Sequence, residues 1–214
     1  MARILLLHGL GGTAATVAPV AALLAAGGHE VHAPTLPGHG TDPTDLLTVT
    51  WADWLHAAGQ WPADVIVGQS MGGSLALALA ATQACRAVVA INPPAPDPDA
   101  VDGLEWQRDR GHEWVDGPPL AEGEEGYTRL PIAALLEMVC GSLLTDAAAI
   151  TVPVLLVTSA LDDVVDPYSA DLVATSLSGP VTRLRLEDSG HVATLGPQQS
   201  LLVAEIEAFV SQLG

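Results

Sequence analysis

The sequence has no lysine, and its seven arginines face 25 aspartate and glutamate residues, which gives a formal net charge of -18. A chain this acidic repels the phosphates of nucleic acids and the headgroups of anionic lipids. We therefore expect no nucleic-acid partner and no basic patch for binding membranes. We attribute the acidic surface to solubility.

Cysteine is scarce, and long apolar runs are missing. Cys85 and Cys140 lie far apart and lack a CxxC pattern, which argues against a disulfide framework and a structural zinc site. The opening residues, MARILLLHG, hold too short an apolar run for a signal peptide, and no uncharged run reaches the length of a membrane span. We expect a cytoplasmic protein with no stable membrane insertion. Its oligomeric state cannot be read from the sequence.

What the sequence does contain is a regular alternation of short apolar runs with longer amphipathic stretches. This rhythm is typical of βα units around a mostly parallel sheet. Runs such as ILLL and VLLV do not alternate with polar residues, as expected for strands covered by helices on both faces. The predicted strands span 3–7, 29–33, 63–67, 86–91, 153–158 and 181–186. The predicted helices span 14–26, 44–59, 71–84, 168–177 and 197–212.

The alternation stops between Asn92 and Ile150, where a stretch rich in proline, glycine and acidic residues begins. We interpret 95–149 as a small cap inserted over one end of the sheet, and 1–94 with 150–214 as the core domain. A disordered linker is an equally good interpretation of residues 93–127.

The segment VGQSMGG at 67–73 places a serine among glycines where a strand gives way to a helix. This is the sequence form of a nucleophile elbow, in which a tight turn exposes the serine at the end of the strand. A glycine-rich helix start could also serve packing alone. The strand before it and the helix after it favour Ser70 as a nucleophile.

A serine nucleophile needs a base and a group that orients the base. His191 follows the last predicted strand, at the same edge of the sheet as Ser70, although a loop histidine can also be an ordinary surface residue. The loop after the strand 153–158 offers Asp162, Asp163 and Asp166 as the acid. Three loops at one sheet edge are a more specific signal than any one of them.

With these residues the chain resembles the α/β-hydrolase family, and within it small bacterial carboxylesterases and monoacylglycerol-lipase-like serine hydrolases. The stretches that carry the resemblance are LLLHGLGG at 5–12, PTLPGHG at 34–40, VGQSMGG at 67–73, DDVVDP at 162–167 and SGHVATL at 189–195. The resemblance implies a catalytic triad of Ser70, Asp162 and His191, with Asp163 as the alternative acid. It places the backbone N–H donors of an oxyanion hole on Leu10 and Met71.

The resemblance also implies a reduced form of the fold. Family members usually have two or more strands before the one that leads into the HG turn, whereas here that turn begins at His8. We therefore expect a minimal sheet of about six strands. The missing strands would lie away from the three loops, so the chemistry is unaffected.

His8, His32 and His39 do not follow a metal-ligand spacing such as HxxxH, and we expect no metal and no cofactor. In the insertion, Trp106, Leu135 and Met138 are candidate residues of a pocket for an acyl chain, although they could simply pack the cap onto the sheet.

The predicted activity is hydrolysis of a small-molecule ester with a short to medium aliphatic acyl chain, through an acyl-serine intermediate. A thioesterase, acyltransferase, lactonase or carbon–carbon hydrolase could use the same triad. A binding protein without turnover could use the same fold.

Overall fold

The structure is a computed structural model that describes residues 1–117, 120 and 123–213. Its centre is a six-stranded sheet in the order β2-β1-β3-β4-β7-β8, with every neighbouring pair parallel. The strands are β1 (Arg3–Leu7), β2 (Glu30–His32), β3 (Val65–Gln69), β4 (Ala87–Ile91), β7 (Val154–Ser159) and β8 (Val181–Leu186). The predicted minimal α/β-hydrolase sheet is confirmed.

The apolar strands contribute side chains to two hydrophobic cores, one on each face of the sheet. Paired residues Leu5, Ile66, Val88 and Val154 belong to one core, whereas their chain neighbours Ile4, Leu6, Val65 and Val67 belong to the other. Successive strand residues point to opposite faces, so a strand buried on both sides needs an unbroken apolar run.

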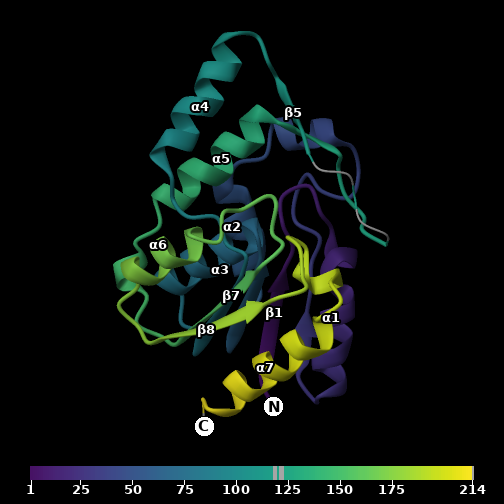
Figure 1. The fold of residues 1–214 in the computed structure, drawn as a ribbon, viewed down its shortest axis with the longest axis vertical. Helices are drawn as coiled ribbons and strands as arrows, with labels where there is room; N and C mark the ends of the chain where they lie inside the picture. Colours follow the sequence, from purple (N-terminus) through teal and green to yellow (C-terminus); the bar gives the residue numbers. More distant parts are fainter. Residues whose placement is uncertain (118–119, 121–122, 214) are drawn as a thin grey trace.

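Helices cover both faces (Figure 1). On one face lie α1 (Ala14–Ala26) and α7 (Gln199–Ser211), and on the other lie α2 (Trp51–Gly59), α3 (Met71–Thr82) and α6 (Ser169–Ser176). Both chain ends lie at the lower end of the molecule in this view. Among the described residues, no helix has the length and apolarity needed to cross a bilayer.

The single helix predicted over 44–59 is wrong in its middle. The structure has a short 3-10 helix, η1 (Pro43–Leu47), and then α2. Thr50 separates the two, because its hydroxyl accepts from the Asp53 amide and the Asp53 carboxylate accepts from the Thr50 amide at 2.9 Å. This reciprocal capping box starts a new helix rather than continuing the earlier one.

The segment between β4 and β7 contains α4 (Pro98–Asp109), α5 (Ile132–Leu143) and a small antiparallel ribbon of β5 (Trp114–Asp116) and β6 (Arg129–Pro131). A short 3-10 helix, η2 (Ala147–Ala149), follows. The disordered-linker interpretation of 93–127 is wrong for 98–109 and 114–116; residues 118, 119, 121 and 122 lie outside the described residues. Figure 1 shows α4 and α5 beyond one end of the sheet.

Candidate active site

Ser70 occupies the turn between β3 and α3. Its φ of 57° is positive, a backbone conformation that is strained for a residue with a Cβ. The turn is held on both sides: the Ser70 amide donates to the Ile91 carbonyl, and the Ser70 carbonyl accepts from the Gly73 amide, both at 2.8 Å. This geometry presents the Ser70 side chain at the carboxyl edge of the sheet.

Two glycines make the turn possible because they leave room for neighbouring backbone. A Cβ on Gly68 would overlap the carbonyl oxygen of Gly72, and a Cβ on Gly72 would overlap the carbonyl oxygen of Leu7. The start of α3 therefore packs directly against the backbone of β3 and β1. Close backbone approach, rather than an unusual φ, explains these two glycines.

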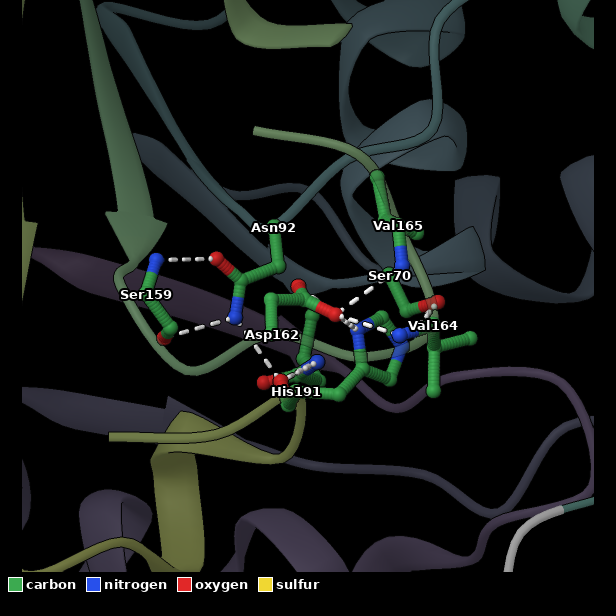
Figure 2. A network of polar contacts seen from close by, with 8 residues as sticks. Ser70, Asn92, Ser159, Asp162, Val164, Val165 and His191 are labelled. Carbon is green, nitrogen blue, oxygen red and sulfur yellow. Dashed lines mark hydrogen bonds and ion pairs between the residues drawn. The ribbon is translucent and has the colours of Figure 1, made fainter. Parts of the chain in front are cut away.

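The side chains of Ser70, His191 and Asp162 form one hydrogen-bonded row (Figure 2). Ser70 Oγ lies 3.0 Å from His191 Nε2, and His191 Nδ1 lies 2.9 Å and 3.0 Å from the two carboxylate oxygens of Asp162. With the proton on Nδ1, the imidazole donates to Asp162 and accepts from the serine hydroxyl. The ring can then take a proton from Ser70.

The loop after β7 holds the Asp162 carboxylate as an anion. The Asp162 side chain is 2% exposed, and its Oδ1 accepts from the amides of Val164 and Val165, each at 2.9 Å. Burial raises the pKa of Asp162, but hydrogen bonding and charge interaction with His191 and the two amides outweigh it, so the net pKa lies below the ordinary value. Asp163 is exposed; it is Asp162 that contacts the imidazole.

The chain before Leu10 and the start of α3 lie close to Ser70. A Cβ built on Gly9 would stand 3.2 Å from Ser70 Cβ and 3.7 Å from its Oγ, so the chain leading into Leu10 runs directly beside the hydroxyl. Met71 is the first residue of α3, and the first amides of a helix have no partner within it. Such amides favour negative charge.

His8 and His39 are buried next to the HG turn that follows β1. His8 Nδ1 donates to the Gly9 carbonyl at 2.8 Å, and its Nε2 accepts from the Leu36 amide at 3.0 Å. Burial, together with the nearby His39, lowers the pKa of His8 to about 3. The neutral ring therefore braces the HG turn. Within the part of the chain that the structure describes, no three or more His, Cys, Asp or Glu residues form a group suited to a metal ion.

The three candidate pocket residues differ in their surroundings. Met138 on α5 is partly buried against the hydrophobic core, as are Leu10 and Tyr127. Leu135 is half-buried on the same helix. Trp106 on α4 is 56% exposed and carries the Arg110 guanidinium over its ring at 3.7 Å.

Sequence reasoning missed two amides at this site. The side chains of Gln69 and Asn92 both donate to the backbone carbonyl of His191 at 2.8 Å. A signal was present for the second, since Asn92 is the only asparagine in the chain and directly follows a buried strand.

Two known proteins with similar sequences are named as a lipase and a carboxylesterase. A thermostable monoacylglycerol lipase of Bacillus sp. (strain H-257) is 31% identical, with 99% of this chain and 91% of that protein covered. A carboxylesterase of Bacillus subtilis (strain 168) is 25% identical, with 98% and 92% covered.

Among solved structures, that of a metagenome-derived lipolytic enzyme, from work on LipS and LipT, has a TM-score of 0.87 and 27% identity, covering 98% of this chain and 93% of that one. The profile of the alpha/beta hydrolase family matches residues 4–205. On this match, together with the parallel sheet and the serine elbow, the chain belongs to the alpha/beta hydrolase family.

Proposed function

We propose that this protein is a serine esterase that hydrolyses short- to medium-chain aliphatic carboxylic esters. The observation that carries the proposal is the unbroken row from Ser70 Oγ through the His191 ring to the Asp162 carboxylate. A serine hydroxyl is a weak nucleophile at neutral pH unless an adjacent base accepts its proton. The relatives named monoacylglycerol lipase and carboxylesterase support esters, glycerol monoesters among them, as substrates.

In the acylation step, Ser70 Oγ bonds to the ester carbonyl carbon while its proton passes to His191 Nε2. The carbonyl electron pair moves onto oxygen, and the amides of Leu10 and Met71 hold the resulting oxyanion. The bond to the alkoxy oxygen then breaks, and His191 returns the proton to the departing alcohol. Asp162 keeps the imidazole in the required orientation and offsets its positive charge.

Deacylation repeats these steps with water as the nucleophile. His191 takes a proton from water as the hydroxyl oxygen attacks the acyl carbon, and the proton returns to Ser70 Oγ when the acyl bond breaks. The products are a carboxylic acid and free Ser70. This chemistry requires no cofactor.

We also propose that residues 95–149 act as a cap over a core formed by 1–94 and 150–214. The position of α5 beyond one end of the sheet supports this division (Figure 1). In this arrangement Leu135 and Met138 face the acyl chain. Trp106 contributes less, because its ring is exposed and stacked under Arg110.

The test is covalent labelling with a fluorophosphonate combined with turnover of p-nitrophenyl esters of increasing chain length. Wild type should be labelled and should hydrolyse esters, and S70A should lose labelling and at least about 10³-fold of kcat. Acyl thioesters and lactones assayed in parallel define the leaving group. Folded wild type that resists the probe and turns over no ester would contradict the proposal.

A further inference from the structure

The backbone carbonyl of His191 is held by an unusual number of donors. Gln69 Nε2 and Asn92 Nδ2 each donate to it at 2.8 Å, and the local Ala193 amide donates at 3.0 Å. Gln69 ends β3 directly before Ser70, and Asn92 directly follows β4. The loop that carries His191 is therefore tied to two adjacent central strands.

Asn92 also connects this carbonyl to the loop after β7, which carries Asp162 and is called the acid loop below; the loop of His191 is called the base loop. Its Oδ1 accepts from the Ser159 amide at 2.8 Å, and its Nδ2 donates to Ser159 Oγ at 2.9 Å (Figure 2). Ser159 ends β7, and its own carbonyl accepts from the Asp162 amide at 3.3 Å. One side chain thus fixes the base loop and the acid loop relative to each other.

The conformation of Asn92 is as specific as its contacts. Its φ of 47° is in the left-handed region, where asparagine is among the more tolerant residues with a side chain. It is 3% exposed. An amide supplies one acceptor and two donor hydrogens on one planar group, and all of these functions are used here. Aspartate keeps the shape but lacks the donors.

The side chain of Gln69 buries a polar atom that has no partner in the described part of the chain, which a residue selected only for stability would not do. Its side chain is 2% exposed, and its Oε1 has no hydrogen-bond partner among the described residues. A buried oxygen without a partner destabilises the fold. The side chain nevertheless lies here, with its amide nitrogen on the carbonyl of His191.

We propose that Asn92 and Gln69 are positioning residues for the base. By anchoring the His191 backbone they fix the point from which the imidazole extends, which keeps Nε2 at 3.0 Å from Ser70 Oγ. Asn92 in addition sets the distance between the imidazole loop and the loop of Asp162. This inference rests on the proposed function, in which His191 moves a proton to and from Ser70.

Q69L gives the sharpest test, because it removes a bond to His191 and an unpartnered oxygen together. Its unfolding midpoint should stay within about 2 °C of wild type, whereas kcat for a p-nitrophenyl ester should fall about tenfold. N92A and N92D should lower kcat about 10²-fold with KM changed less than about threefold. The rate of fluorophosphonate labelling should fall in parallel.

S142A is the matched control, since Ser142 is buried and donates to the Met138 carbonyl at 2.9 Å on α5. It removes a buried hydrogen bond away from the His191 carbonyl and should keep its kcat. Q69L carries the test if neither variant at position 92 folds. The double variant N92A/Q69L should lose less than the product of the single effects, because both amides hold one carbonyl.

The outcomes separate this inference from the proposed function. Wild-type turnover that depends on Ser70, together with folded Q69L and N92D variants at full kcat, would overturn the positioning role alone. The positioning role is also overturned if the loss of activity in the variants equals their unfolded fraction. Wild type without turnover that depends on Ser70 would overturn the proposed function, and this inference with it.

Discussion

At the scale of single residues, the site depends on neighbours that differ sharply in their surroundings. Asp162 is buried against His191 and accepts two backbone amides, whereas Asp163 next to it is exposed. Two adjacent acids that the sequence could not tell apart are therefore distinguished by the turn of the loop. Only one of them can hold the imidazole.

D162N should lower kcat for an ester about 10³- to 10⁴-fold, because an amide does not offset the positive charge of the imidazolium and favours the wrong tautomer. D163N should stay within about twofold of wild type. Steady-state kinetics of both variants at neutral pH give the comparison. A larger loss in D163N would assign the acid to the exposed residue and contradict the row described above.

Adding one methyl group at Gly68 and at Gly103 should have opposite effects on stability. G68A should destabilise the fold by about 3 kcal/mol or more, because its Cβ would overlap the Gly72 backbone. G103A should stabilise α4 by about 0.5–1 kcal/mol, since nothing lies within 4 Å of the added Cβ. Urea denaturation measures both, and equal stabilities would contradict the close packing at the elbow.

At the scale of elements, the segment between β4 and β7 is coupled to the HG loop. The Tyr127 amide donates to the Gly11 carbonyl at 2.9 Å, and Gly12 and Gly126 form an isolated bridge. The Tyr127 hydroxyl donates to the Gly38 carbonyl at 3.0 Å and accepts from the Thr41 amide at 3.1 Å. This tyrosine joins the segment between β4 and β7 to the loops that follow β1 and β2.

Y127F should lower the free energy of unfolding by about 1–2 kcal/mol, because it leaves a carbonyl and an amide without their partner. Y168F is the control, since Tyr168, the only other tyrosine, is 62% exposed. Thermal unfolding that does not distinguish the two variants would contradict the coupling.

Elements with strong local signals were predictable from the sequence. The strands 3–7 and 181–186 and the helix 14–26 match the structure to the residue. An apolar run identifies the first strand, an alternation of leucine and arginine the second, and a stretch rich in alanine, valine and leucine that ends at Gly27 the helix. The strand before Ser70 was predicted two residues early, at 63–67 instead of Val65–Gln69. Gly68 and Gln69 are poor strand formers, and tertiary pairing with Ala90 and Ile91 overrides that preference.

The site was predictable as far as its motifs reach. Ser70 and His191 are found in short patterns, and the order of strands brings them to one edge of a parallel sheet. Gln69 and Asn92 act through a backbone carbonyl more than 90 residues away in sequence, and no local pattern encodes such a contact. The predicted helix 44–59 is divided at Thr50 by a capping box. The helical spacing of apolar residues continues across Thr50, so the spacing alone does not reveal the division.

At the scale of the whole molecule, a neutral buried histidine links stability to pH. His8 is fully buried with a pKa of about 3, against 6.5 for the free group. Between these values the unfolded chain binds a proton that the folded chain does not. The contribution to stability is therefore complete above about pH 6.5 and is lost as the pH falls toward 3.

The free energy of unfolding should fall more steeply between pH 6 and pH 4 in wild type than in H8Q. The difference should approach one proton, about 1.4 kcal/mol per pH unit. Urea titrations across this range measure the slopes; identical slopes in wild type and H8Q would show that the buried ring is protonated in the fold.

In the proposed mechanism, Ser70 carries the acyl group during turnover. Mass spectrometry of protein quenched with acid during hydrolysis of a p-nitrophenyl ester measures this directly. We expect one acyl group per chain on the peptide that contains Ser70, formed in the burst of nitrophenol and absent from S70A. Turnover with no adduct on that peptide, or with the same rate in S70A, would contradict it.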